Sequence, residues 1–309
     1  MSRSVRRSRR VERDQSSSLA SYRGSVGNDG ETPAALQLTS RLRVRAAYVA
    51  AVAKELSERD RAVIGTVRLL HAVSGAQLER LHFVDLAASS RPVMRRRVLA
   101  RLVRLRLLVT LERRIGGVRA GSAGLVYALD TAGQRLTADG EGGKATRRPW
   151  TPSARFLDHR LAGSELYVQL REAERHRGLE LLRFLAEPDS WQQTATLGLL
   201  KPDAYAVVAS DSVEDAWWIE IDQGTESVPT LRRKLHVYLD AARAGHLGPD
   251  GVLPRVLVAV NSEQRREAVE DLISRLPAPA SALLCVETQA DAAAFILNTL
   301  HDQDAADGQ

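Results

Sequence analysis

The sequence is poor in cysteine and in long apolar runs, and each shortage excludes a structural feature. Its single cysteine, Cys285, excludes an intramolecular disulfide and a cysteine-rich zinc site. No apolar run reaches the length of about 20 residues that a membrane-spanning helix needs. The arginines of the N-terminus are not followed by an apolar stretch, so they do not form a secretory signal. We therefore expect a cytoplasmic protein with no membrane partner.

Basic residues outnumber acidic ones. The chain has 44 Lys and Arg against 38 Asp and Glu, which gives a formal net charge of +6. This balance fits a polyanionic partner such as nucleic acid, but a solvated basic surface without such a partner is an alternative. Hydrophobic residues make up 44% of the 309 residues, which is enough to form the cores of two ordinary domains.

Changes in composition divide the chain into five parts. Residues 1–40 are rich in Arg, Ser and Gly and predict a disordered basic arm, which either contacts phosphates or only keeps the protein in solution. Residues 41–137 predict a first folded domain, and the polar, glycine-rich residues 138–149 predict a linker. Residues 150–301 predict a second domain, and residues 302–309 a polar, frayed tail.

Three helices followed by a β-hairpin are predicted in the first domain. A helix capped by Ser57 is followed by a short helix and by a third helix from Arg91 to about Leu107. Residues 107–113 and 125–129 are rich in β-formers and are separated by a glycine-rich segment. This order of elements predicts a winged helix-turn-helix.

The third helix carries a basic stripe opposite an apolar stripe, the pattern by which a recognition helix packs on its domain and faces a DNA groove. No acidic residue occurs between Asp85 and Glu112. The candidate DNA-binding residues are the arginines of this helix and of the wing: Arg91, Arg95, Arg96, Arg97, Arg101, Arg104, Arg113, Arg114 and Arg119. Two alternatives remain, a merely solvated arginine face and a winged helix used for protein contact or dimerisation.

Helices alternate with strands in the second domain, which predicts an α/β fold with a mixed sheet. The predicted strands cover residues 179–185, 204–209, 216–222, 253–260 and 282–286. The predicted helices cover residues 154–177, 228–244, 263–276 and 290–300. The run at 253–260 is continuously apolar, as is typical of a strand buried within a parallel sheet.

Five charged residues of this domain form a candidate catalytic site: Glu165, Asp203, Glu220, Asp222 and Lys234. Glu220 and Asp222 share one face of their strand, and Asp203 would join them if its strand is the neighbour. These three carboxylates are the candidate ligands of Mg²⁺ or Mn²⁺, which activates water and stabilises charge on a scissile phosphate. Lys234 would assist at the water or the phosphate, and Glu165 would reach the site from the first helix. The alternative is a set of solvated acids at strand ends.

Two strings in the second domain resemble the replication-relaxation family of plasmid and integrative-element proteins. They are Lys201-Pro202-Asp203-Ala204 and Trp218-Ile219-Glu220-Ile221-Asp222-Gln223-Gly224-Thr225-Glu226, followed by Lys234 and Tyr238. His159 also matches the family's pattern, although a lone histidine is more often structural. The resemblance spans roughly residues 57–300. It implies a winged helix joined to a restriction-endonuclease-like α/β domain similar to PD-(D/E)xK nucleases.

The resemblance also implies a role in plasmid or mobile-element replication, relaxation or mobilisation, with a metal-dependent nicking activity. Its partners would be double-stranded DNA and replication or mobilisation proteins. Asp203 and Glu220 match the acidic pair of the nucleases, but Asp222 stands where their motif has lysine, and Lys234 would have to substitute. Otherwise the protein is a non-catalytic replication or transcription regulator. Its degenerate nuclease fold would then serve docking or the formation of a homodimer.

Overall fold

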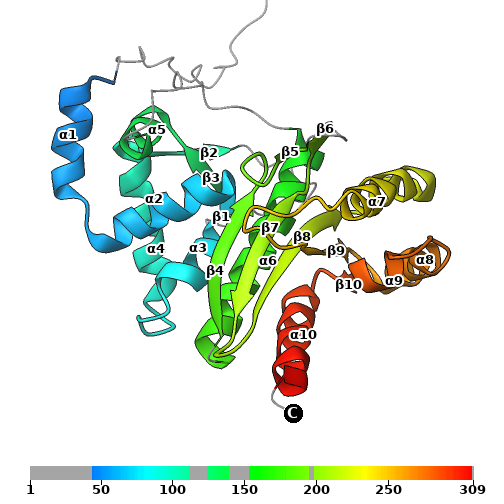
Figure 1. The fold of residues 1–309 in the computed structure, drawn as a ribbon. Helices are drawn as coiled ribbons and strands as arrows, with labels where there is room; N and C mark the ends of the chain where they lie inside the picture. The colour runs from blue at the N-terminus through cyan, green and yellow to red at the C-terminus, as the bar shows by residue number, and fades with distance from the viewer. Residues whose placement is uncertain (1–43, 112–123, 139–152, 178, 195–197, 308–309) are drawn as a thin grey trace, which may run out of the picture. The chain divides into compact units, whose positions relative to one another are not determined.

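The computed structural model describes residues 44–111, 124–138, 153–177, 179–194 and 198–307 (Figure 1). These ranges all belong to one compact unit, Val44–Gln309. The unit is a mixed α+β structure with helices around a three-stranded and a five-stranded sheet. The predicted arm, most of the predicted linker, and Arg113, Arg114 and Arg119 lie outside the described residues. Within the described ranges, no helix combines the length and the apolar character that crossing a membrane requires.

Residues 44–138, which we call the helical module, contain five helices and three short strands among their described residues. The helices are α1 (Ala46–Glu55), α2 (Glu58–Leu70), α3 (Gly75–His82), α4 (Arg91–Arg104) and α5 (Thr131–Thr137). The strands β1 (Val73–Ser74), β2 (Leu108–Leu111) and β3 (Val126–Leu129) pair antiparallel in the order β1-β3-β2. The three predicted helices are therefore present, although α4 ends at Arg104 rather than near Leu107, and β2 and β3 lie in the two predicted strand segments, of which residues 112–113 lie outside the described residues.

Serine caps begin two of these helices. The Ser57 side chain accepts a hydrogen bond from the Asp60 N–H, and the Asp60 carboxylate accepts one from the Ser57 N–H. Ser74 and Gln77 form the same reciprocal arrangement at the start of α3. Each capping box satisfies two backbone N–H groups that the first helical turn leaves without partners. Local sequence therefore fixes where α2 and α3 begin.

Residues 153–307, which we call the α/β module, are built on the five-stranded sheet. Its strands are β4 (Glu180–Ala186), β7 (Ala204–Ala209), β8 (Glu214–Asp222), β9 (Arg255–Val260) and β10 (Leu284–Thr288). Their spatial order is β10-β9-β8-β7-β4. Neighbours among β4, β7 and β8 are antiparallel, whereas β8, β9 and β10 are parallel. A separate hairpin, β5 (Gln192–Thr194) and β6 (Gly198–Leu200), lies in the chain between β4 and β7.

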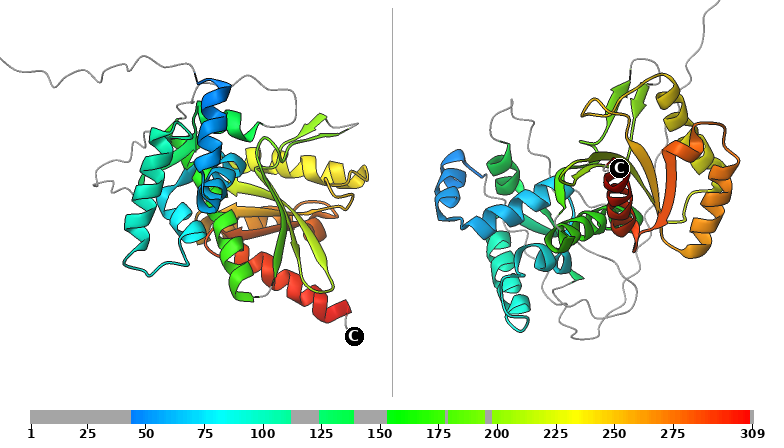
Figure 2. Two further views of the ribbon diagram at one scale, coloured as in Figure 1. Left: turned by 90° about the vertical axis from the view of Figure 1, so that its left-hand side faces the viewer. Right: turned by 60° about the horizontal axis from the view of Figure 1, so that its bottom comes forward.

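Helices cover both faces of this sheet (Figure 2). One face packs against α6 (Ala154–Arg177) and α10 (Ala292–Asp307), and the other against α7 (Val228–Arg243), α8 (Glu263–Ser274) and α9 (Ala280–Leu283). Trp217 and Trp218 are adjacent on β8 and fully buried, and they point to opposite faces. Trp217 contacts Phe295 of α10, and Trp218 contacts Tyr238 of α7. Strand β8 is therefore the centre of two cores.

Two elements near the C-terminus differ from the sequence-based expectation. Helix α9, residues 280–283, includes the first two residues of the strand predicted at 282–286, because the N–H groups of Ala282 and Leu283 donate to the carbonyl of Pro279. Helix α10 continues to Asp307, beyond the start of the predicted frayed tail. No proline or glycine interrupts residues 301–307, so nothing in the local sequence ends the helix earlier.

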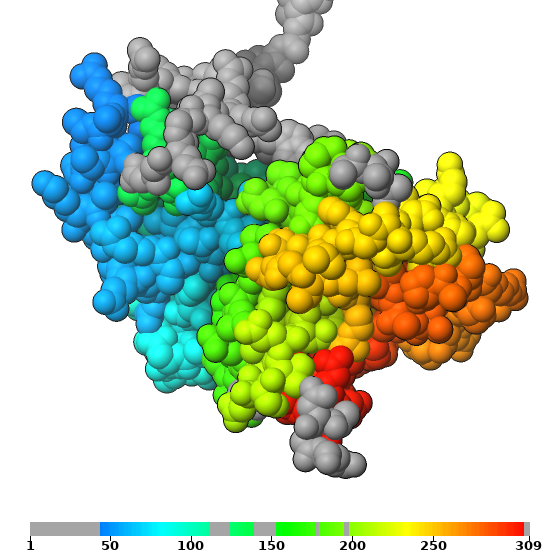
Figure 3. All heavy atoms as spheres, viewed as in Figure 1, coloured from blue at the N-terminus to red at the C-terminus, as the bar shows by residue number. Residues whose placement is uncertain are grey.

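One hydrophobic core joins the two modules. It contains Leu78 of α3 together with Leu166 and Leu170 of α6 and the sheet residues around Trp217. Helix α2 of the helical module contacts strand β4 of the sheet, and in Figure 3 the blue and cyan atoms of this module lie directly against green atoms. The two modules of the described residues therefore pack together within one compact unit.

Candidate functional site

Asp203, Glu220 and Lys234 come together in the α/β module. Asp203 immediately precedes β7, Glu220 lies on the neighbouring strand β8, and Lys234 lies on α7. Lys234 forms an ion pair with Glu220, and its Nζ lies 3.8 Å from Asp203 Oδ2. The structure thus brings together three of the five residues that the sequence nominates as catalytic. We call these three residues the carboxylate–lysine cluster.

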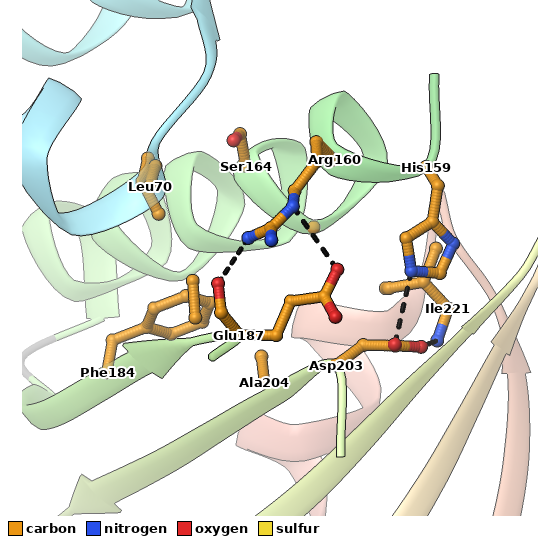
Figure 4. Close-up of a pocket in the computed structure, with 11 residues that line it drawn as sticks. Leu70, His159, Arg160, Ser164, Phe184, Glu187, Asp203, Ala204 and Ile221 are labelled. Atoms are coloured by element: carbon orange, nitrogen blue, oxygen red, sulfur yellow. Dashed lines mark hydrogen bonds and ion pairs between the residues drawn. The ribbon is translucent and has the colours of Figure 1, made fainter. Parts of the chain in front are cut away.

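Each acid of the cluster has further partners within the protein. Asp203 Oδ1 lies 3.1 Å from Nε2 of His159 on α6, and Asp203 Oδ2 accepts a hydrogen bond of 2.8 Å from the Ile221 N–H (Figure 4). Glu220 is 1% exposed and accepts a hydrogen bond from the Tyr238 hydroxyl. Burial at this depth requires such partners, because an unpaired carboxylate out of water is costly.

The two acids differ in how firmly they hold a proton. Burial raises the pKa of Glu220 well above its ordinary value, and the nearby charge of Asp203 adds to the effect despite Lys234. Burial also raises the pKa of Asp203, but His159 and Lys234 outweigh it, so the pKa is lowered overall. Burial lowers the pKa of Lys234, yet Glu220 and Asp203 raise it overall. At neutral pH, Asp203 is therefore the carboxylate that keeps its charge, and Glu220 is the one that binds a proton readily.

His159 is coupled to the cluster through Asp203. Burial lowers the pKa of His159, but its hydrogen bond to Asp203 and the charge of that carboxylate raise the pKa overall. The imidazole therefore takes up a proton more readily than a free histidine does. The sequence supplies His159 only as a match to a family pattern, because 44 residues of chain separate it from Asp203.

A small pocket beside the cluster lies between α6 and strands β4 and β7 (Figure 4). His159, Glu187 and Asp203 line it, and each offers a ligand atom within 4.8 Å of the other two. One imidazole nitrogen and two carboxylate oxygens are donors that suit Mn²⁺, and the oxygens also suit Mg²⁺. Arg160 approaches the Glu187 carboxylate at 3.2 Å. Sequence analysis does not nominate Glu187; its only signal is its position directly after a strand.

The other two nominated acids are paired elsewhere. Asp222 lies on the same face of β8 as Glu220, but its carboxylate accepts a hydrogen bond of 2.8 Å from Arg265 Nε on α8. Glu165 on α6 forms an ion pair with Arg80 on α3. Both arginines are remote in sequence from the acids they bind, so local spacing gives no sign of them. The donor set that fits a divalent cation is therefore His159, Glu187 and Asp203, rather than a set that includes Asp222.

The exposed face of α4 is basic. Its residues are Val93, Arg96, Arg97, Ala100 and Arg104, which recur at helical spacing. The opposite face of the helix is buried and consists of Arg95, Leu99 and Leu102. Three arginines thus project from one side of the helix.

The remaining nominated arginines of α4 are bound within the protein. Arg95 is 5% exposed and forms an ion pair with Glu79 of α3. Arg101 pairs with the fully buried Asp60 of α2. Arg91 donates to the carbonyl oxygens of Leu86 and Val84, which precede the helix. The structure therefore divides the predicted arginine stripe into three exposed side chains and three that hold α4 in place.

A family model described as replication-relaxation matches residues 64–256, more than half of the chain. The matched region runs from within α2 to the start of β9, so it includes α4 and the carboxylate–lysine cluster. No curated protein matches the chain, and no solved structure matches it.

Proposed function

Because the chain belongs to the replication-relaxation family, we propose that it binds double-stranded DNA and nicks it during replication or relaxation of a plasmid or mobile element. Family membership by itself indicates the general role in replication or relaxation. The observation that carries the cleavage proposal is the carboxylate–lysine cluster, in which two acids from adjacent strands share one lysine. The observation that supports DNA binding is the exposed arginine face of α4.

In this proposal the helical module is a winged helix-turn-helix. The order α2, α3, α4, then β2 and β3, with β1 completing a small antiparallel sheet, supports this assignment. In such a domain the third helix enters the major groove. Here that helix is α4, and it presents Arg96, Arg97 and Arg104 to phosphates and base edges.

DNA binding by α4 is tested by the salt dependence of affinity. The triple variant Arg96→Ala/Arg97→Ala/Arg104→Ala should bind duplex DNA more weakly, and the slope of log K against log salt should fall by about one for each arginine that no longer reaches a phosphate. Arg275→Ala is the matched control, because this arginine is exposed at the end of α8 on the opposite side of the sheet from α6. An unchanged affinity and slope in the triple variant would exclude α4 as the DNA-binding face.

In the α/β module we propose a metal-assisted phosphodiester hydrolase related to the PD-(D/E)xK nucleases. His159, Glu187 and Asp203 would hold Mg²⁺ or Mn²⁺, which supplies an activated water and offsets charge on the phosphate when bound. Lys234 is the cation of the cluster and would stabilise negative charge on the reacting phosphate. Glu220, which is buried and forms an ion pair with Lys234, would hold that lysine in position at the site.

A second candidate function is non-catalytic, and one observation favours it. Both oxygens of Asp203 and both oxygens of Glu220 already contact other groups of the protein: His159, Ile221 N–H, Lys234 and Tyr238. A saturated cluster of this kind is stable without metal or DNA. The α/β module would then be a docking or dimerisation platform for replication or mobilisation proteins.

A plasmid-nicking assay separates the two candidates. Wild type and Glu220→Ala are incubated with supercoiled DNA with and without Mg²⁺ or Mn²⁺, and duplex binding is followed in parallel by gel shift. A nickase converts supercoiled plasmid to open circles only when the metal is present. Glu220→Ala should lower the rate of this conversion by about 100-fold or more and should keep duplex binding. Glu270→Ala, an exposed acid on α8, is the control. Absence of nicking by a wild-type protein that still binds DNA would favour the non-catalytic function.

A further inference from the structure

An exposed aromatic–cation pair lies at the foot of the β5–β6 hairpin. Lys201 Nζ is 5.0 Å from the ring centroid of Trp191. Trp191 is 37% exposed, whereas Trp217 and Trp218 are fully buried. Trp191 is therefore the exposed tryptophan among the residues that the structure describes.

The pair belongs to a continuous exposed face of the hairpin. Gln193 pairs with Leu199 across the two strands. Trp191 and Lys201 lie two residues from Gln193 and Leu199 respectively, so by the alternation of side chains they belong to the same face, where they contact each other. All four side chains are exposed, and Leu199 is 43% exposed. Leu200, which alternates to the other face, is buried. We call Trp191, Gln193, Leu199 and Lys201 the hairpin face.

Hydrogen bonds join the foot of the hairpin to the candidate site. Ser190 Oγ donates to the Pro202 carbonyl at 2.6 Å, and this contact is buried. The Glu187 N–H donates to the Asp203 carbonyl at 3.0 Å. The segment that carries Trp191 and the segment that carries Lys201 are therefore bound to each other next to two residues of the pocket. The hairpin face is held at a fixed place beside the pocket.

We propose that the hairpin face binds an unpaired DNA nucleotide beside the bond to be cut. The Trp191 ring offers a flat surface on which a base stacks, and stacking tolerates any base because every base has a π-face. Lys201 supplies a point charge for the adjoining phosphate, and the Gln193 amide can donate to and accept from a base edge. An intact duplex does not expose a base face inside its stack, so the ligand is single-stranded or locally melted DNA. This inference rests on the proposed function, which brings a DNA strand to the pocket. It adds that the substrate is single-stranded or locally melted DNA.

Tryptophan fluorescence tests the inference directly. In a Trp150→Phe background, Trp191 is the exposed tryptophan, and an oligothymidylate should quench its emission in a saturable, salt-dependent way. Trp191→Ala and Lys201→Met should each weaken binding of the oligonucleotide about 5- to 150-fold, measured by anisotropy of a labelled strand. Trp191→Phe, which keeps a ring in the hairpin, should retain most of the affinity. Lys54→Met on α1 and Leu247→Ala after α7 alter exposed side chains elsewhere and are the controls.

The outcomes distinguish this inference from the proposed function. Unchanged oligonucleotide affinity in folded Trp191→Ala and Lys201→Met, with no quenching of Trp191, overturns the hairpin face as a nucleotide site. If wild type and those variants then nick plasmid equally, the proposed nickase stands without it. If wild type does not nick but Trp191 is quenched and both variants lose affinity, the hairpin face stands as a single-strand site and the nickase fails. Circular dichroism confirms that each variant is folded.

Discussion

Lys234 is the side chain that both acids of the carboxylate–lysine cluster share. Its side chain is 33% exposed, whereas that of Glu220 is 2% exposed. Water can therefore reach the lysine but not its partner. Removal of one member of a buried ion pair usually costs more than the pair itself contributes, because the other charge stays buried without compensation.

We predict that Lys234→Met lowers the free energy of unfolding by roughly 2 kcal/mol at pH 8 and by less at pH 5. Without the lysine, the folded-state pKa of Glu220, already raised by burial, lies still further above that of the unfolded chain. A carboxyl group raised in this way removes stability as the pH rises through the interval between its unfolded and folded pKa. Urea unfolding at the two pH values measures the difference.

The control for this prediction removes the buried charge together with the lysine. Lys234→Met/Glu220→Gln should recover most of the stability at pH 8, because no carboxylate is left to ionise at position 220. An equal loss at pH 5 and pH 8 in the single variant would show that the lysine contributes by packing alone.

At the residue scale, the sequence identifies candidate acidic residues better than it identifies the basic residues that bind them. Spacing along β8 and the Pro-Asp string nominate Asp203 and Glu220, and the structure places both beside Lys234. Glu165 and Asp222 are nominated together with them, yet Arg80 and Arg265 bind these two acids. Which acid meets which cation depends on contacts between distant segments, and no local pattern contains that information.

At the scale of elements, α5 approaches the segment between α4 and β2 so closely that one position requires glycine. A Cβ atom on Gly133 would lie 2.1 Å from the carbonyl oxygen of Leu107. By contrast, a Cβ atom on Gly65, on the exposed side of α2, would have no atom within 4 Å. Both glycines lie inside helices, so they form a matched pair with opposite surroundings.

We predict that Gly133→Ala and Gly65→Ala change stability in opposite directions. Gly133→Ala should lower the free energy of unfolding by about 1–3 kcal/mol, because the clash outweighs the better helix propensity of alanine. Gly65→Ala should raise it by about 1 kcal/mol through that propensity. Urea titrations of the two variants provide the comparison. If both variants gain stability, α5 does not pack on Leu107 as described.

The first and last residues of helices and strands can be predicted from local sequence where a capping residue or a strong hydrophobic periodicity marks them. Helix α6 covers the predicted residues 154–177, strand β7 covers 204–209, and α7 ends one residue before its predicted end. Helices α1 and α5 are not predicted from the sequence, since each is short and depends on the surrounding core. Helix α9 replaces the start of a predicted strand because its hydrogen bonds go back to a proline carbonyl rather than across the sheet.

At the scale of the whole described unit, a polar clamp reinforces the shared core. Arg80 of α3 pairs with both Glu165 and Glu172 of α6. Gln77 donates to the Leu161 carbonyl and to Glu165, each at 3.0 Å. Helix α3 precedes α4 in the chain, and α6 carries His159. The clamp therefore connects the proposed DNA-binding face to the candidate site through two helices.

We predict one cooperative unfolding transition for the wild type. Far-UV circular dichroism, which reports both modules, and the fluorescence of the buried Trp217 and Trp218, which reports the α/β module, should have the same urea midpoint. Arg80→Ala should lower the free energy of unfolding by about 1 kcal/mol, a modest value because the Arg80 side chain is 39% exposed. The urea midpoint followed by circular dichroism should move to lower urea before the midpoint followed by fluorescence does.

Arg275→Ala, which removes an exposed pair on α8, should shift neither midpoint measurably. Two resolved transitions in the wild type would mean that the helical module and the α/β module unfold independently and that the clamp does not couple them.

Because α3 and α6 are clamped, the arginine face of α4 and the carboxylate–lysine cluster keep one separation and one relative orientation. If the protein binds and cuts DNA as proposed, DNA held by both would have to present its recognised bases and its cut bond a set number of base pairs apart and on a set side of the double helix. In a target with about five extra base pairs between them, the bond would turn to the far side of the duplex. With about ten extra, one full turn, it would return to the near side but lie roughly 34 Å further along. The protein would therefore tolerate changes in the DNA sequence between the recognised bases and the cut bond, but not changes in the number of base pairs between them.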